Sequence, residues 1–158
     1  MKTKLTYTVV LAVIAVAATW LISSKNNSPK DNAVAIGKEI VMFKNAGCQC
    51  CDMWADYMED NGYQVSVKEV KNMAEIKKEK GVPDNMASCH TTTIDGYTIE
   101  GHVPIEDINR LLTEKPDVVG ITAPGMPSSA PGMNTKLNDP YSVFVFDSAG
   151  KSTLFASH

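Results

Sequence analysis

Residues 38–62 read KEIVMFKNAGCQCCDMWADYMEDNG and carry the strongest indication of the fold. The short, apolar and partly β-branched run at residues 38–44 predicts a strand, which ends at Asn45-Ala46-Gly47. From Cys51 to Asn61 apolar side chains recur at helical spacing, and Gly62 supplies a C-cap. This stretch therefore predicts a strand that leads through a cysteine-bearing turn into a helix.

The same criteria predict further elements along the chain. In order, they are a strand at residues 64–70, a short helix at 72–80, a β-hairpin at 91–100, a helix from Pro104 to Leu112, a loop at 116–140 and a second hairpin at 141–156. Up to Leu112 this order is the thioredoxin arrangement. We therefore expect an α/β, thioredoxin-like fold, with a central mixed sheet flanked by helices and an extra C-terminal β-hairpin.

The N-terminal segment has the pattern of an export signal. Lys2 and Lys4 precede an apolar run at residues 5–22, and a polar stretch follows it. A run of about 18 residues suits both a cleaved signal and a short membrane-spanning helix. We expect residues 1–25 to be a signal peptide or an inner-membrane anchor, residues 26–37 a linker, and residues 38–158 an exported or periplasmic metal-binding domain.

The charge of the chain argues against some partners. The formal net charge is −3, and the first 25 residues carry three lysines and no acidic residue, so the remainder is more acidic still. An acidic domain without a basic stripe binds nucleic acid poorly. We expect no nucleic-acid partner, and membrane contact only through the N-terminal segment.

Three of the four cysteines lie at the predicted strand-to-helix turn, where Cys48 and Cys51 form C-x-x-C and Cys48 and Cys50 form C-x-C. A helix N-terminus stabilises thiolate, which is both a nucleophile and a metal ligand. Cys89 precedes the third strand, at the place where a thioredoxin fold faces that turn. Four sulfurs there favour a soft metal, Cu(I) above all.

Several interpretations of these cysteines stay open. Side chains of the neighbours Cys50 and Cys51 diverge by about 100° on a helix, so we expect them to bridge several ions rather than to close on one. The main alternative is a thiol-disulfide oxidoreductase, with Cys48 as nucleophile and Cys51 as resolving thiol. A structural zinc site and ordinary buried or disulfide-bonded cysteines are further alternatives.

Two histidines and two methionines are additional candidate ligands. His90 adjoins Cys89, and His102 lies between the first hairpin and the following helix, so both can approach the cysteine turn. In a polar loop, Met126 lies between Gly125 and Pro127, and Met133 follows Gly132. Thioether sulfur is a soft ligand for Cu(I). Each of the four also has a structural interpretation, as a hydrogen-bonded loop histidine or a packed methionine. His158 is expected to be a solvated chain end.

Several motifs together resemble the CopG-type copper-resistance family, many members of which are labelled as a domain of unknown function. They are Cys48-x-Cys50-Cys51, Ser88-Cys89-His90-Thr91, Asp95-Gly96-Tyr97, Glu100-Gly101-His102-Val103-Pro104, Pro124-Gly125-Met126-Pro127 with Pro131-Gly132-Met133, and Phe155-Ala156-Ser157.

This resemblance implies a periplasmic, thioredoxin-like protein that binds copper in a cysteine-held cluster. It also implies a role in copper resistance, with cycling between Cu(I) and Cu(II) as a candidate oxidoreductase activity and other periplasmic copper-handling proteins as candidate partners. The ligand roles carry onto Cys48, Cys50, Cys51 and Cys89. The positions of His90, His102, Met126 and Met133 match the family pattern as well.

Overall fold

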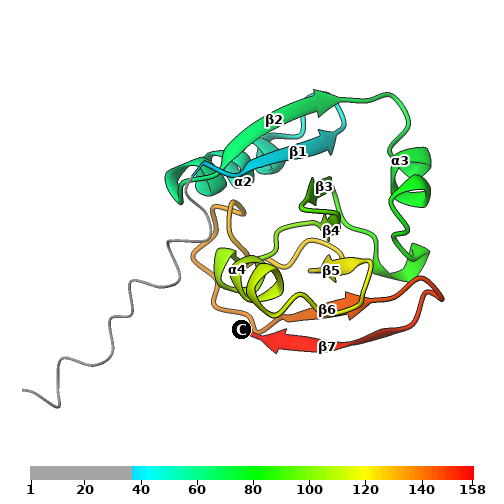
Figure 1. Cartoon of the computed structure of the whole chain (residues 1–158). Helices are drawn as coiled ribbons and strands as arrows, with labels where there is room; N and C mark the ends of the chain where they lie inside the picture. Colours follow the sequence, from blue (N-terminus) through cyan, green and yellow to red (C-terminus); the bar gives the residue numbers. More distant parts are fainter. Residues whose placement is uncertain (1–36) are drawn as a thin grey trace, which may run out of the picture. The chain divides into compact units, whose positions relative to one another are not determined.

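The computed structural model describes residues 37–158, which form one seven-stranded sheet with three α-helices and a short 3-10 helix (Figure 1). In chain order the elements are β1 (Glu39–Lys44), α2 (Gln49–Asp60), β2 (Gln64–Glu69), α3 (Met73–Glu79), η1 (Asp84–Met86), β3 (Thr91–Ile94), β4 (Tyr97–Glu100), α4 (Ile105–Glu114), β5 (Gly120–Thr122), β6 (Ser142–Phe146) and β7 (Ser152–Ser157).

The strands lie in the order β2-β1-β3-β4-β5-β6-β7 and form a mixed sheet with parallel and antiparallel pairs. β1 runs parallel to β2 and antiparallel to β3, and β4 runs antiparallel to β3 and parallel to β5. β5, β6 and β7 complete the sheet with antiparallel pairs. The expectation of an α/β fold with a mixed sheet is confirmed.

One expected loop is wrong in part, because residues 116–140 contain β5. This strand is only three residues long, and its flanking Gly, Pro and Ser composition reads as loop. Gly120 lies so close to β4 that a Cβ there would overlap the carbonyl of Thr98. The C-terminal hairpin is therefore joined through β5 to the sheet that carries the cysteines.

The main core lies between the helices and the sheet. Trp54 and Met58 of α2 and Leu111 of α4 are fully buried and belong to one hydrophobic cluster with strand residues such as Met42 and Ile99. Burying each large apolar side chain of this kind contributes about 1.5–3 kcal/mol to folding. This packing fixes the start of α2 against the sheet.

The expected signal or anchor at residues 1–25 and the linker up to residue 36 lie outside the described residues. Within residues 37–158, every helix is too short or too polar to cross a membrane.

Candidate metal centre

The start of α2 positions three cysteines. Cys48 is the N-cap residue, and Cys50 and Cys51 lie in the first turn, since the helix begins at Gln49, two residues earlier than predicted. The buried Lys44 ammonium at the end of β1 lies 2.5 Å from the carboxylate of Asp52 and ties the two elements together. The cysteine turn is thus held on a strand and a helix, where the free amides of a helix N-terminus favour thiolate.

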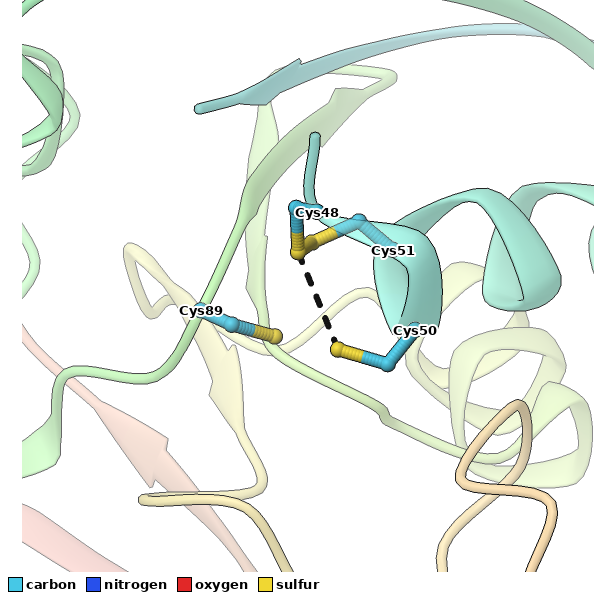
Figure 2. Close-up of side chains that lie close together, drawn as sticks. All are labelled: Cys48, Cys50, Cys51 and Cys89. Carbon is cyan, nitrogen blue, oxygen red and sulfur yellow. Dashed lines mark hydrogen bonds between the residues drawn. A yellow bond between two sulfur atoms is a disulfide. The ribbon is translucent and has the colours of Figure 1, made fainter. Parts of the chain in front are cut away.

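Cys89 approaches this turn from the segment between η1 and β3 (Figure 2). The four Sγ atoms of Cys48, Cys50, Cys51 and Cys89, hereafter the cysteine cluster, all lie within 4.8 Å of one another. The expectation that the Cys50 and Cys51 side chains diverge is therefore wrong. At a helix start, rotation about χ1 can return both sulfurs to a common point.

The cysteine cluster contains one disulfide, between Cys48 and Cys51. Cys50 and Cys89 are free thiols, and the Sγ of Cys50 lies 3.7 Å from that of Cys48. Burial, with the nearby Cys50 as a second cause, raises the pKa of Cys89 to about 11. The Cys89 thiol is accordingly protonated near neutral pH, and a bound metal cation would reverse that preference.

The backbone on either side of Cys89 is held by the fully buried carboxylate of Glu100. It accepts hydrogen bonds from the Ser88 amide at 2.6 Å and from the Thr91 hydroxyl at 2.6 Å. The ammonium of Lys77 on α3 lies 2.5 Å from the same carboxylate. Glu100 and Lys77 therefore position Cys89. Neither role could be predicted from the sequence, because an acidic residue at a strand end and a Lys-rich helix are typical of solvated surface.

His102 presents a lone pair to the cysteine cluster. Its Nδ1 lies 2.7 Å from the carbonyl oxygen of Pro131, and its Nε2 lies 3.0 Å from the Sγ of Cys89. A carbonyl only accepts, so Nδ1 carries the proton and Nε2 is the free acceptor. Burial lowers the pKa of His102 and favours this neutral form. A second partner of this kind is typical of metal-binding histidines.

His90 is a second buried imidazole beside Cys89. Its Nδ1 lies 3.4 Å from the Sγ of Cys89, and its ring centroid lies 5.0 Å from that of His102. Its Nε2 is buried without a hydrogen-bond partner among residues 37–158. Burial is the main cause that lowers the pKa of His90, so the ring is neutral and able to act as a ligand. Cys89, His90 and His102 form a second group with metal-binding spacing.

The Gly- and Pro-rich loop reaches the site through Gly132. This residue has a φ of +78°, and a Cβ there would lie 2.7 Å from the backbone nitrogen of Trp54 on α2. Glycine thus lets the loop lie against α2, which places the Pro131 carbonyl at His102. Met126 is exposed and Met133 half-buried, and their roles as metal ligands stay predictions.

His158 is exposed, as the sequence suggested for a chain end, but its side chain also has partners within the fold. Its Nε2 lies 2.8 Å from a carboxylate oxygen of Asp107, and its ring stacks on Tyr141 with centroids 5.0 Å apart. Backbone hydrogen bonds between His158 and Tyr141 extend the β6–β7 pairing to this end. His158 therefore serves the fold and has no part in the two groups with metal-binding spacing.

Comparison with known proteins identifies the family. Residues 86–133, which include Cys89 and both histidines of the site, match the family model described as "Protein of unknown function, DUF411". None of the curated proteins compared with the chain is significantly similar to it.

Two solved structures are similar to the chain, "Copper resistance protein copG- Form 1" and "Copper resistance protein copG- Form 2". In each case the sequence identity is 38% and the TM-score 0.73, and the match covers 77% of this chain and 98% of the other. The resemblance seen in the motifs is therefore confirmed: the chain belongs to the family of the copper resistance protein CopG.

Proposed function

We propose that this protein binds copper in copper resistance and holds Cu(I) with the cysteine cluster. The observation that carries the proposal is the convergence of four sulfur atoms, from two separate segments, within 4.8 Å of one another. Thiolate sulfur is the ligand type that selects Cu(I) over harder cations. Family membership with a copper resistance protein supports the same metal.

The histidines extend the ligand set. The unprotonated Nε2 of His102 faces the Sγ of Cys89, and the Nδ1 of His90 lies 3.4 Å from the same Sγ. Four thiolates and two neutral imidazoles exceed the needs of one ion, since protein sites for such metals commonly use about four ligands. We therefore propose that more than one Cu(I) is bound, with Cys89 shared between ions.

The fold and the location belong to the same proposal. We propose that the domain is thioredoxin-like, and the parallel β1-α2-β2 unit, the β3–β4 hairpin and α4, with the cysteines at the strand-to-helix turn, support this. The N-terminal pattern of residues 1–25 supports export to the periplasm, either as a cleaved signal or as a retained anchor. Other periplasmic copper-handling proteins are the natural partners there.

Anaerobic titration of the reduced protein with Cu(I), against a competing chelator, tests the proposal. We expect more than one Cu(I) per chain and protection of all four cysteines from alkylation. A variant with serine at Cys48, Cys50, Cys51 and Cys89 is the control and should bind no Cu(I) competitively. Equal binding by the control would contradict the proposal.

The same thiols support a redox role. Two thiols can give one electron to each of two Cu(II) ions, which yields two Cu(I), one disulfide and two protons. The Cys48–Cys51 disulfide is the product that such a step would leave. The rate of Cu(I) formation from Cu(II) should be higher for the reduced protein than for the four-serine variant. Equal rates would remove the redox part and leave copper binding intact.

One observation favours a second candidate, a thiol-disulfide oxidoreductase. The Cys48–Cys51 disulfide lies at a helix N-terminus, which is where exchange-active pairs are found. Insulin reduction by a dithiol would then be accelerated, and Cys50→Ser would change that rate little. Cu(I) binding that depends on Cys50, without insulin turnover, would favour the copper site.

A further inference from the structure

The Cys48–Cys51 disulfide divides the cysteine cluster into two chemically different pairs. Neither sulfur of that bond can become a thiolate, whereas Cys50 and Cys89 keep their thiols. Cysteine binds metal as thiolate. The disulfide-bonded and the reduced chain therefore offer different sets of ligands.

The two free thiols are placed to share one ion. Cys50 comes from α2 and Cys89 from the segment before β3, and their sulfurs point toward one another (Figure 2). The two Sγ atoms are no more than 4.8 Å apart. Two thiolates that share an ion at a metal–sulfur distance of about 2.3 Å stand at most about 4.6 Å apart. The disulfide-bonded structure thus already has nearly the required spacing.

His102 adds a third ligand atom to this pair. Its Nε2 lies 3.0 Å from the Sγ of Cys89, and the Pro131 carbonyl keeps its proton on Nδ1. The Glu100 carboxylate fixes the backbone around Cys89 whatever the state of Cys48 and Cys51, because its partners are Ser88, Thr91 and Lys77. Cys89 and His102 are therefore held independently of the disulfide, whereas Cys50 lies in the turn that the disulfide closes.

We infer that the disulfide-bonded chain retains a site for one Cu(I), formed by Cys50, Cys89 and His102, which reduction enlarges into the full cysteine cluster. The inference rests on the proposed function. Reduction of the Cys48–Cys51 disulfide requires a dithiol. The dithiol gives two electrons and two protons, so that Cys48 and Cys51 become thiols, and it leaves as a disulfide. Copper capacity then follows the redox state of Cys48 and Cys51, and one ion stays bound after oxidation.

The test compares the two redox forms of the full chain. Protein with two free thiols and one disulfide is titrated anaerobically with Cu(I) under a competing chelator, without reductant. Reduced protein is titrated in parallel. We expect one Cu(I) per chain in the disulfide-bonded form and more than one in the reduced form. Cys50→Ser should abolish binding to the disulfide-bonded form.

Two double variants separate the pairs. Cys48→Ser with Cys51→Ser leaves the inferred ligands and should bind one Cu(I), with or without reductant. Cys50→Ser with Cys89→Ser keeps the disulfide and should bind none until it is reduced. Because Cys51 is fully buried, circular dichroism should verify the fold of the first variant, and the wild-type titration decides if it fails to fold.

Three results would overturn the inference. The first is a disulfide-bonded chain that binds no Cu(I) while the reduced chain binds several, which leaves the proposed function standing. The second is air oxidation that consumes all four thiols through a Cys50–Cys89 disulfide. The third is a reduced chain that also binds no copper, which would remove the proposed function as well.

Discussion

At the scale of single residues, the protonation of the groups around Cys89 controls its chemistry. Burial holds His90 and His102 neutral and keeps the Cys89 thiol protonated. A cation that binds at this point displaces the thiol proton and meets two unprotonated imidazole nitrogens. Copper binding should therefore release protons, as metal binding to cysteine does in general.

Alkylation of Cys89 tests this electrostatic account. With the Cys48–Cys51 disulfide closed, the alkylation rate of Cys89 should rise with pH through a pKa of about 11, because thiolate is the reactive form. Cys50→Ser should shift that profile to lower pH, since the nearby Cys50 raises the pKa of Cys89. Mass spectrometry of the labelled peptide gives the profile, and an ordinary thiol pKa for Cys89 would contradict it.

Gly132 offers a second residue-scale test. Gly132→Ala should weaken Cu(I) binding by about 10–100-fold, because it displaces the Pro131 carbonyl that orients His102. Competition with a Cu(I) chelator measures the change.

Gly150→Ala is the matched control. Gly150 has a similar φ of +76°, but no atom lies within 4 Å of a Cβ there. Gly150→Ala should strain the backbone but leave the affinity for Cu(I) unchanged. An equal loss of affinity in Gly132→Ala and Gly150→Ala would refute a specific role for the loop.

At the scale of elements, α3 and the β3–β4 hairpin hold the Cys89 segment through one ion pair. Glu100→Gln should lower the free energy of unfolding by about 2–4 kcal/mol. This loss of stability is close to that for breaking a buried ion pair. It is somewhat smaller because the Lys77 side chain is 15% exposed. Urea denaturation measures it.

Glu79→Gln breaks an exposed ion pair with Lys80, the C-cap residue of α3, and serves as the control. It should change the free energy of unfolding by about 0–1 kcal/mol. If Glu100→Gln costs no more than this, the buried carboxylate does not hold the Cys89 segment.

The sequence predicted most elements, because β1, α2, the β3–β4 hairpin and α4 each carry strong periodicity or turn residues. It missed β5, whose three residues are too few to show a period. It placed Cys89 at the turn through the expected order of elements. It could not show that Glu100 and Lys77 are buried together, or that Cys50 and Cys51 converge, because both depend on side-chain packing between distant segments.

At the scale of the whole molecule, we expect the hydrophobic core and the proposed metal site to make separate contributions to stability. The hydrophobic cluster joins α2, α4 and the sheet, with only Cys51 of the cysteines fully buried in it. Because most of this cluster consists of apolar side chains away from the cysteines, we expect the fold to form without a metal.

Chelation tests that independence. A strong chelator should leave the far-ultraviolet circular dichroism of the protein unchanged. Cu(I) at about 100 times its dissociation constant should raise the free energy of unfolding of the reduced protein by about 2.7 kcal/mol. Unfolding on chelation would instead indicate a structural zinc site.

X-ray absorption at the copper K edge, on the reduced protein loaded with Cu(I), tests copper binding by the cysteine cluster at the metal itself. We expect a first coordination shell dominated by sulfur, copper–copper scattering from neighbouring ions, and loss of both in the four-serine variant. A shell of nitrogen and oxygen that is unchanged when Cys50 and Cys89 are replaced would contradict copper binding by the cysteine cluster.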